Sequence, residues 1–304
     1  MLGAVTVTYN DGYKIEQWRA YYNEIKEVID HYVIVDNGSS DNYRDQVKAY
    51  FPKAELICLE KNCGTTGAYN RGIELLLNKF DCEFIMIYGN DVRVSPADIR
   101  SLIDYLDKHK DVGMITSVLL QKDCSVVADA GCYINKKELS LTVKDAGKDY
   151  SSIEHTPLTV EAVTGGFNIA SAEFYRTVGL QDERLFMYSD EVDMGIRAKE
   201  KNYQMVILRN TVAWHQHINP PGKAIRHPYS AYLMARNKIY LAYKHISSFS
   251  ALRLFVKYLY RDLIRVIYHG IKRNAEKTEW HRWHMIGAFY GLRKDMEPNQ
   301  YSSL

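Results

Sequence analysis

The run Asp190-Glu191-Val192-Asp193 places three carboxylates within four residues. Carboxylates this crowded repel one another, which raises the proton affinity of at least one of them and suits it to act as a general base. Acids in the first turn of a helix also complement the helix dipole, and that explanation needs no catalysis. The run therefore predicts either the base of a proton transfer or the start of a helix.

Asp91 is a candidate metal ligand, because it follows the apolar run Phe84–Tyr88 almost directly. A carboxylate there can hold Mg²⁺ or Mn²⁺, with a diphosphate completing the coordination shell. The alternative is an Asp that shapes a turn ahead of Pro96. On a strand, His215 and His217 would point to opposite faces, so they would not bind one metal together. We expect His215 to complete a site with Asp91.

Two polar turns contain further candidate residues, Tyr9-Asn10-Asp11-Gly12 and Asn37-Gly38-Ser39-Ser40-Asp41. Asp36, just before the second turn, can accept a hydrogen bond from a pyrimidine N–H, and the amides after it can hold polar or anionic groups. An Asx turn with a helix cap explains the same residues without a ligand. Both interpretations stay open at this point.

The segment Asn62–Gly72 carries glycines ahead of a helical pattern. Such glycines let a backbone approach a ligand closely, and a helix N-terminus favours phosphate. Neither G-x-G-x-x-G nor G-K-S/T occurs there, so the segment is not a Rossmann fingerprint or a P-loop.

The elements around these residues indicate an α/β protein, since short β-branched runs alternate with longer helical patterns. The expected strands are Ala4–Thr8, Tyr32–Asp36, Ala54–Leu59 and Phe84–Tyr88, and the expected helices are Ile15–Ile29, Tyr43–Tyr50 and Gly67–Lys79. In open α/β sheets ligands bind outside the carboxyl ends of the strands, where the polar turns lie. We therefore expect the site at this edge of the sheet.

The pattern changes twice after residue 110. From 111 to 203 it is mixed, with Gly165-Gly166 as a flexible break before the acidic run. The segment Asn219-Pro220-Pro221-Gly222 then interrupts the chain, and from Tyr229 on almost everything has helical periodicity. We expect a catalytic domain at 1–222 and a helical, basic region at 223–304.

One segment of the basic region has the cleanest periodicity. Its apolar residues recur at steps of 3 and 4 and form one stripe, consisting of Leu252, Phe255, Val256, Leu259, Leu263, Val266, Ile267 and Ile271. A separate row at steps of 4 consists of Arg253, Lys257, Arg261 and Arg265. A basic amphipathic helix can lie on an anionic bilayer. The pattern fits equally well a helix packed on the catalytic domain with a solvated basic face.

Charge is divided unevenly along the chain. The net charge is +2, but 15 of the 39 Lys and Arg and only 5 of the 37 Asp and Glu follow residue 222, which leaves the rest of the chain acidic by 8. The basic part suits anionic lipid or a phosphate-bearing partner, and nucleic acid is not expected.

The five cysteines lack metal-clip or disulfide-framework spacing, which favours a reducing compartment. Neither a signal peptide nor an uncharged apolar stretch of 18 residues is recognisable. We expect a cytoplasmic protein with peripheral contact to the inner face of the membrane through its basic helices.

Taken together and in order, these motifs resemble the inverting family-2 glycosyltransferases with the GT-A fold, and among them bacterial rhamnosyl- and galactofuranosyltransferases. The resemblance covers Ala4 to about His217. It rests on Val7-Thr8-Tyr9-Asn10, Val35-Asp36-Asn37-Gly38-Ser39, Asn62-x-Gly64-x-x-Gly67-x-x-Asn70-x-Gly72, Asn90-Asp91-Val92, Gly165-Gly166-Phe167, Glu191-x-Asp193-x-x-x-Arg197 and His215. Tyr229 to Asn237 and Tyr268-His269-Gly270 are similar to the helical tail of rhamnosyltransferases. The implied fold is a Rossmann-like mixed sheet flanked by helices, with a mostly helical C-terminal region.

The resemblance also implies roles for the matched positions. The nucleotide-sugar donor would be bound by Thr8, Tyr9, Asn10, Asp36, Asn62, Gly64, Asn70, Asn90 and Asp91. A divalent metal, Mn²⁺ or Mg²⁺, would be held by Asp91 and His215. The acceptor and sugar side would include Gly165, Gly166, Arg197 and Trp214.

Two positions depart from the family pattern. Gly89 stands where the first acid of an Asp-x-Asp metal motif should be. The base position carries Glu191 within Asp190-Glu191-x-Asp193, where the family has Glu-Asp-x-Asp. The implied mechanism is a single displacement in which Glu191 deprotonates the acceptor hydroxyl, while Asp190 and Asp193 position acceptor or sugar hydroxyls.

On the tail resemblance we expect dTDP-rhamnose as donor, with UDP-galactofuranose or another UDP-sugar as the alternative. The expected acceptor is a surface-polysaccharide or lipid-linked glycan. A nucleotidyltransferase is disfavoured, because the turn Thr8–Gly12 lacks the basic residue of a phosphate loop. A non-catalytic sugar-nucleotide binder is the second rival, and Gly89 is the feature that favours it.

Overall fold

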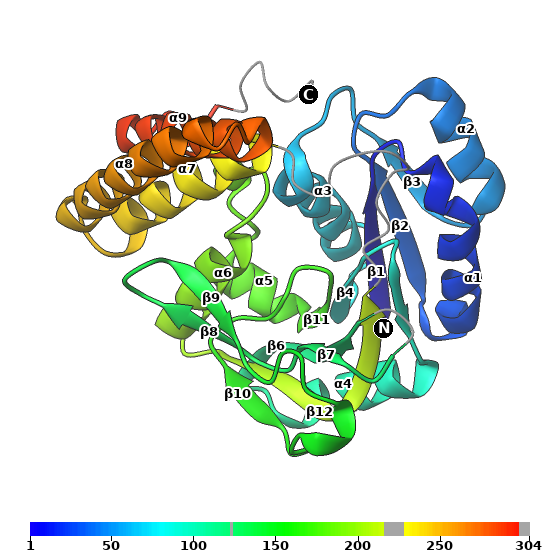
Figure 1. Cartoon of the computed structure of the whole chain (residues 1–304). Helices are drawn as coiled ribbons and strands as arrows, with labels where there is room; N and C mark the ends of the chain where they lie inside the picture. Colours follow the sequence, from blue (N-terminus) through cyan, green and yellow to red (C-terminus); the bar gives the residue numbers. More distant parts are fainter. Residues whose placement is uncertain (122–123, 216–227, 298–304) are drawn as a thin grey trace.

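The computed structural model describes residues 1–121, 124–215 and 228–297 (Figure 1). Its centre is a ten-stranded mixed sheet in the order β10-β12-β6-β11-β4-β1-β2-β3, with β5 paired to β12 and β7 to β6. The strands of the sheet are β1 (Leu2–Thr8), β2 (His31–Asp36), β3 (Glu55–Cys58), β4 (Phe84–Tyr88), β5 (Val92–Val94), β6 (Val112–Leu120), β7 (Val127–Asp129), β10 (Leu158–Val160), β11 (Phe167–Ser171) and β12 (Gln204–His215). A hairpin of β8 (Cys132–Asn135) and β9 (Ser140–Val143) stands apart from it.

The first half of the chain confirms the predicted βα alternation. β1 to β4 run parallel, and each lies within two residues of its predicted bounds. The helices between them are α1 (Ile15–Ile25), α2 (Asp41–Tyr50) and α3 (Gly64–Asn78). Because the four strands point the same way, their carboxyl ends meet at one edge of the sheet.

The segment with a mixed pattern supplies the antiparallel part of the sheet. β11 pairs antiparallel with both β4 and β6, whereas β12 is parallel to β6. The helices between β5 and β12 are α4 (Pro96–Lys108), α5 (Ala172–Val178) and α6 (Asp190–Glu200). Short loops around β11 therefore bring the segment before α6 to the same edge as the turn after β4.

Helices cover both faces of the sheet. On one face α1, α2 and α4 contribute buried side chains such as Trp18, Val47 and Leu102. On the other face α3 and α5 contribute Ile73 and Phe174, together with side chains of α6. With both faces covered, the strands are apolar on both sides, which explains the fully buried pattern of β6.

A layer of three helices follows, made of α7 (Pro228–His245), α8 (Ser248–Ile271) and α9 (Ala275–Arg293) (Figure 1). α9 approaches α7 closely, since a Cβ on Gly287 would lie 2.1 Å from the Tyr232 carbonyl oxygen. The boundary expected at 222/223 lies outside the described residues. No helix in the described ranges is long and apolar enough to cross a bilayer.

The predicted apolar stripe of α8 is only partly a packing face. Phe255 is buried, but Leu252, Val256, Leu263, Ile267 and Ile271 are exposed. The residues that pack α8 into the layer are instead Ala251, Leu254, Phe255, Tyr258, Asp262 and His269. The five cysteines are all free thiols, as expected.

Candidate active site

The carboxyl ends of β1, β2 and β4 bring the polar turns together, as expected. Thr8 pairs with Asp36 at the end of β1 and β2. The Asn90 side-chain amide, just after β4, donates to Asp11 Oδ2 at 2.8 Å. Three turns that are far apart in the sequence therefore form one continuous edge.

The carboxylate of Asp36 is fully buried, and only one of its two oxygens is hydrogen-bonded among the described residues. Its Oδ2 accepts from Arg44 Nε at 2.7 Å and from the Ser39 amide at 3.2 Å. Its Oδ1 has no hydrogen-bond partner within the described part of the chain. A buried carboxylate oxygen without a donor costs free energy, so Oδ1 is suited to accept an N–H from a ligand.

The first turn is fastened to the second. The Asn10 amide donates to Ser39 Oγ at 2.9 Å, and the Ser40 amide donates to Asn10 Oδ1 at 3.1 Å. Asn10 adopts a left-handed conformation with φ of 50°. Tyr9 beside it is exposed, while Thr8 is buried and its hydroxyl is hydrogen-bonded to Tyr43.

Two residues expected to bind the nucleotide-sugar donor, Asn62 and Asn70, are hydrogen-bonded to other residues of the protein. Asn62 Oδ1 accepts from Asn37 at 3.0 Å and from the Gly64 amide at 2.9 Å. The Asn70 side chain bonds the backbone of Gln181 in both directions, at 2.9 and 3.0 Å. Asn62 and Asn70 therefore shape the loops of the site.

Gly64 is required by the local backbone geometry. Its φ is +75°, and a Cβ there would lie 2.1 Å from the Phe186 carbonyl oxygen. Only glycine allows this approach of the segment before α3 to the segment before α6. The expectation that Gly64 borders a pyrophosphate does not describe its main contact.

Asp91 and His215, the two expected metal ligands, lie together. His215 Nε2 is 3.3 Å from Asp91 Oδ1, and both side chains are mostly buried. Glycines make room for them, because a Cβ on Gly166 would lie 2.8 Å from the His215 ring and a Cβ on Gly89 would lie 3.2 Å from Asp91. Residue 217 lies outside the described ranges.

The donor set fits a divalent cation that is also bound by a diphosphate. Imidazole and carboxylate are ligands of Mn²⁺, and a phosphate ligand would supply the remaining oxygens. Among the described residues no group of three or more His, Cys, Asp or Glu side chains could hold a metal without such help. Asp91 and His215 could therefore hold a cation only together with such a ligand.

Lys14 is a neighbour of this site that the sequence did not indicate. Its ammonium lies 3.8 Å from Asp91 Oδ2, 3.5 Å from Asp11 Oδ1 and 3.4 Å from Asn90 Oδ1. Lys14 ends a single turn of 3₁₀ helix, Gly12–Lys14, so no periodicity marked it. A cation here adds to the positive potential that a diphosphate would meet.

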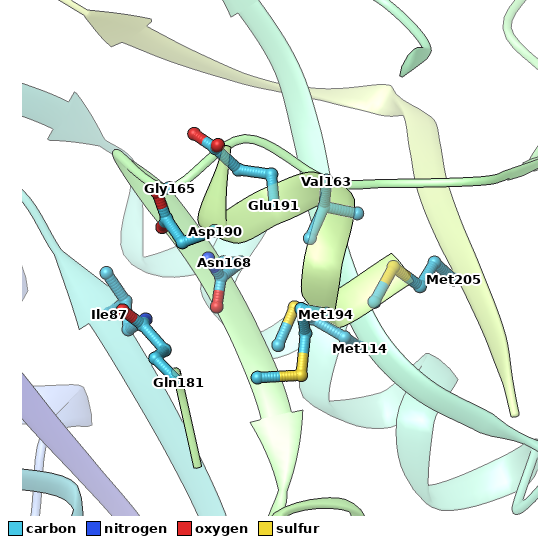
Figure 2. A pocket seen from close by; sticks show the side chains of 10 residues that line it. All are labelled: Ile87, Met114, Val163, Gly165, Asn168, Gln181, Asp190, Glu191, Met194 and Met205. Atoms are coloured by element: carbon cyan, nitrogen blue, oxygen red, sulfur yellow. The ribbon is translucent and has the colours of Figure 1, made fainter. Parts of the chain in front are cut away.

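Asp190 and Glu191 begin α6 beside Gly165 (Figure 2). A Cβ on Gly165 would lie 3.3 Å from Glu191 Oε1 and 3.7 Å from Asp190 Oδ2. The Gly166 carbonyl accepts from the Gly89 amide at 2.9 Å, so the two glycines connect the acidic pair with the Asp91 turn. The pair also lines a pocket that ends at the apolar side chains of Met114, Met194 and Met205 (Figure 2).

The two carboxyls of the pair lie close enough to affect each other's protonation. Burial raises the pKa of Asp190, and the charge of Glu191 raises it further. Burial also raises the pKa of Glu191, although its own amide, the Gly165 amide and a hydrogen bond from the Asp190 carboxyl partly offset this rise. Each carboxyl therefore holds its proton more tightly than an exposed acid does, and the hydrogen bond between them favours the ionised form of Glu191.

Asp193 and Arg197, which were expected to position acceptor or sugar hydroxyls, are bonded to other parts of the protein. Asp193 is fully buried, and its oxygens accept from Arg197 Nε at 2.8 Å, His245 Nε2 at 2.7 Å and Lys244 Nζ at 2.5 Å. Arg197 also donates to the carbonyls of residues 178 and 180 at 2.7 and 2.9 Å. Four-residue spacing places both on the inner side of α6, so they join α6 to its surroundings.

Trp214 lies one residue before His215 on β12, on the opposite side of the strand. Its ring faces the guanidinium of Arg93 at 6.0 Å. Because neighbouring strand residues alternate in direction, Trp214 and His215 cannot both face the pair. The expected acceptor contact of Trp214 therefore lacks support from its position.

The backbone just before the pair forms an elbow, residues 186–189, that the sequence analysis missed. Phe186, Tyr188 and Ser189 all have positive φ, between 63° and 69°. Each such non-glycine residue costs on the order of 1 kcal/mol, so the surroundings must hold the elbow in place. No sequence signal marks it, because none of these residues is a turn former of the left-handed type.

The elbow is held from two sides. From the α3 side, the Phe186 carbonyl accepts from the Thr66 amide and from the hydroxyls of Thr65 and Thr66, each at 3.3 Å. From α7, the Asn237 side-chain amide donates to the carbonyls of residues 185, 187 and 188 at 2.8 to 2.9 Å. The loop on the donor side and the helical layer therefore fix the start of α6 together.

Tyr69 is a further residue that the sequence analysis left out. Burial raises the pKa of its hydroxyl, and the charges of Asp91 and Asp190 raise it further. Its phenol therefore remains protonated and lies close enough to both carboxylates to be affected by each.

Residues 4–140 match the model of the family Glycosyl transferase family 2. The chain is 26% identical to a dTDP-rhamnosyl transferase RfbF of Shigella flexneri, over 95% of this chain and 95% of that protein. It is 23% identical to an N-acetylglucosaminyl-diphospho-decaprenol L-rhamnosyltransferase of Mycobacterium tuberculosis, over 81% of this chain and 85% of that protein.

Solved structures agree on the fold. A structure of GalNAc-T7 with UDP, GalNAc and Mn²⁺ aligns with a TM-score of 0.60 at 12% identity, over 80% of this chain and 47% of the other. The chain thus spans about half the length of that protein. These matches bear out the predicted GT-A fold and the predicted glycosyltransferase activity.

Proposed function

Because the chain is a glycosyltransferase with a Glycosyl transferase family 2 domain on a GT-A fold, we propose that it transfers L-rhamnose from dTDP-rhamnose to a glycan hydroxyl with inversion. The names of two curated relatives that align over most of their length support the choice of sugar. The observation that carries the proposal is the position of the acidic pair, Asp190 and Glu191, beside Gly165. The next residue, Gly166, packs on His215, which lies beside Asp91.

The donor's base would bind at the Asp36 turn. The unpaired Oδ1 of Asp36 would accept the N3–H of thymine, and the exposed ring of Tyr9 offers a face for stacking. Arg44 fixes the orientation of the Asp36 carboxylate, since it bonds the other oxygen. This arrangement suits a pyrimidine with a protonated N3, which thymine and uracil share.

The diphosphate would bind between Lys14 and the Asp91 turn. Asp91 and His215 would hold Mn²⁺ or Mg²⁺, whose charge stabilises the diphosphate as it leaves. Lys14 supplies a second positive charge from the protein itself. Both lie at the same edge as Asp36, so a nucleoside diphosphate can extend from the base pocket to the metal ligands.

Glu191 would act as the base. Hydrogen bonds from Asp190 and from the Gly165 amide would favour its ionised form, although burial raises the pKa of both carboxyls. Glu191 takes the proton of the acceptor hydroxyl as the oxygen attacks the anomeric carbon, and the bond to the diphosphate breaks on the opposite face. The sugar is thereby inverted.

The acceptor is proposed to be a lipid-linked or surface glycan. The mycobacterial relative supports this choice, because it is named for a diphospho-decaprenol acceptor. Such an acceptor is presented at a membrane surface. We therefore also propose peripheral membrane contact through the basic helical layer, at the cytoplasmic face.

The decisive experiment is a donor screen combined with a base variant. dTDP-rhamnose should release dTDP in the presence of Mn²⁺ and a lipid-linked GlcNAc acceptor, faster than UDP-galactofuranose or UDP-glucose releases UDP. Glu191→Gln should lower turnover by roughly 10²–10⁴-fold while the dissociation constant for dTDP changes less than twofold.

Glu200→Gln, which changes an exposed acid at the end of the same helix, is the matched control and should keep full activity. Full activity of Glu191→Gln would move the base to Asp190. Binding of dTDP with no turnover of any donor by the unaltered protein would instead support a sugar-nucleotide binder.

A further inference from the structure

The outer face of α8 carries large apolar side chains that nothing in the described chain covers. Phe249 is 76% exposed and Ile271 is 77% exposed, and the rest of the set is about half exposed or more. The set, here called the α8 outer stripe, consists of Phe249, Leu252, Val256, Tyr260, Leu263, Ile264, Ile267, Tyr268 and Ile271. Contiguous exposed apolar surface of this extent is rare on proteins that have no partner for it.

The stripe is a continuous face and not a scatter of surface residues. Seven of its members follow one another at steps of 3 or 4 from Phe249 to Ile271, which places them on one side of a 24-residue helix. The opposite side of α8 supplies the buried contacts of the helical layer, through Leu254, Phe255 and Tyr258. The α8 outer stripe therefore does not contribute to the packing of the helical layer.

The exposed surface continues onto α9. The ring of Phe289 packs on Phe255 at 4.9 Å between centroids, and Phe289 and Ile286 are themselves exposed. α8 and α9 thus present one apolar surface at the far end of the molecule from β2 and β3 (Figure 1).

The charges that α8 itself leaves exposed are positive. α8 has a single acid, Asp262, which is fully buried and bonded to Arg261, His281 and His284. Among the described residues, no ion pair is formed by the exposed cations Arg265, Lys272 and Arg273. Arg253 and Lys257, by contrast, bond the backbone of Lys137 and the side chain of Glu138.

We propose that the α8 outer stripe inserts into the interface of an anionic bilayer, with Arg265, Lys272 and Arg273 bound to its headgroups. Apolar side chains with interspersed tyrosines suit the boundary between headgroups and acyl chains, and cations near it gain from anionic lipid. The proposal rests on the proposed function for its purpose, because a lipid-linked acceptor is presented at such a surface.

A second copy of the chain is the other candidate occupant, and the charges disfavour it. Packing two α8 outer stripes against each other would bring two rows of cations together with no exposed acid on either helix. Like charges placed in contact weaken association. An anionic bilayer satisfies the apolar face and the cations at the same time.

The test measures flotation with vesicles of phosphatidylcholine alone or with 30% phosphatidylglycerol. The unaltered protein should float with the anionic vesicles. Phe249→Ser combined with Tyr260→Ser, Ile267→Ser and Ile271→Ser should reduce flotation at least tenfold without lowering the Tm, because these side chains are exposed. Arg265→Gln with Lys272→Gln and Arg273→Gln should reduce the preference for phosphatidylglycerol by a similar factor.

Lys48→Gln with Lys53→Gln and Lys108→Gln removes the same charge from exposed positions outside the helical layer and should leave flotation unchanged. The proposal is overturned if the unaltered protein stays in the aqueous fraction, if the serine variant still floats, or if the serine substitutions convert a dimer into a monomer. Donor turnover with a water-soluble acceptor should be equal in the serine variant and the unaltered protein. A protein that floats yet turns over no donor would contradict the proposed function and leave this inference standing.

Discussion

At the scale of single residues, the different roles proposed for Asp190 and Glu191 rest on the hydrogen bond between their carboxyls. Both pKa values are raised by burial, but the Asp190 carboxyl donates to Glu191 and so stabilises its ionised form. A base with a raised pKa works only above that pKa, because its protonated form cannot accept another proton. Activity should therefore be lost on acidification at a higher pH than an ordinary Glu would allow.

The first prediction concerns this acidic limb of kcat/KM. Asp190→Ala removes the donor to Glu191, so the pKa of Glu191 should rise and the acidic limb should move to higher pH by about one unit. Asp190→Asn keeps an N–H donor in the same place and should leave the limb within about 0.3 unit of its original position. The pH profile of dTDP release measures both, and an equal shift in the two variants would contradict the assigned donor.

The second prediction concerns the metal. Asp91→Asn should weaken Mn²⁺ binding in the presence of dTDP by at least about tenfold, as seen by calorimetry, because two protein ligands are few and the loss of one is not compensated. Chelation with EDTA should reduce transfer to the same level in the variant and the unaltered protein. Asp41→Asn, an exposed acid at the start of α2, is the control. Unchanged Mn²⁺ affinity would show that Asp91 does not bind the metal.

Residue types at the sheet edge could be predicted from the sequence, but their partners could not. Asp36, Asp91 and His215 lie where the strand-end rule places them. Asn70 and Gly64 also belong to a polar, glycine-containing segment. They contact the backbone of Gln181 and Phe186. A polar residue near a strand end is expected to form hydrogen bonds. Only the three-dimensional structure shows whether its partner is a neighbouring backbone group or is left for a ligand.

At the scale of elements, α6 is placed by contacts that reach it from α3 and α7. Burial alone would raise the pKa of Asp193, but the bonds from His245 and Lys244 and the charge of Arg197 outweigh it and lower the pKa. The stabilisation that this gives is present above the ordinary carboxyl pKa and is lost as the pH falls through the lowered one. The inner side of α6 is thus an anchor, while its first two residues face the pocket.

The third prediction tests the hold of α7 on the elbow. Asn237→Ala should lower kcat by roughly 10–100-fold with the dTDP dissociation constant within twofold, because the elbow that presents Glu191 loses its donor while the Asp36 turn is untouched. Stability should fall by about 1–3 kcal/mol in urea unfolding. Asn78→Ala, exposed at the end of α3, should change neither quantity. An unaltered kcat in Asn237→Ala would show that the elbow holds itself.

Element boundaries in the first half could be predicted because apolar periodicity and turn residues agree there. α8 shows where such reasoning stops. Periodicity indicated one apolar stripe, but the helix is apolar on two sides, and the sequence cannot say which side is covered. The three left-handed residues of the elbow were missed because tertiary contacts impose their conformation.

At the scale of the whole molecule, the catalytic part and the helical layer share one core. Leu185 and Val192 of the catalytic part lie in the same buried cluster as Ile239, Leu254 and Ala288 of the layer. Arg236, fully buried in α7, donates to the carbonyls of residues 184 and 185 at 3.1 and 3.0 Å. The sequence predicted two regions and left open whether the basic helix packs on the catalytic domain, and the shared cluster shows that the helical layer does.

The fourth prediction follows from this shared core. Calorimetry of the full chain should show a single unfolding transition, because separating the two parts exposes the apolar cluster and leaves the buried guanidinium of Arg236 and the carbonyls of the elbow without partners. A fragment ending at residue 222 should show no cooperative transition of its own. Two separated transitions in the full chain, or a fragment that melts like the intact protein, would contradict it. If the single transition is found, a layer bound to a bilayer through the α8 outer stripe must also fix the orientation of the Glu191 pocket, since the two parts share one buried cluster.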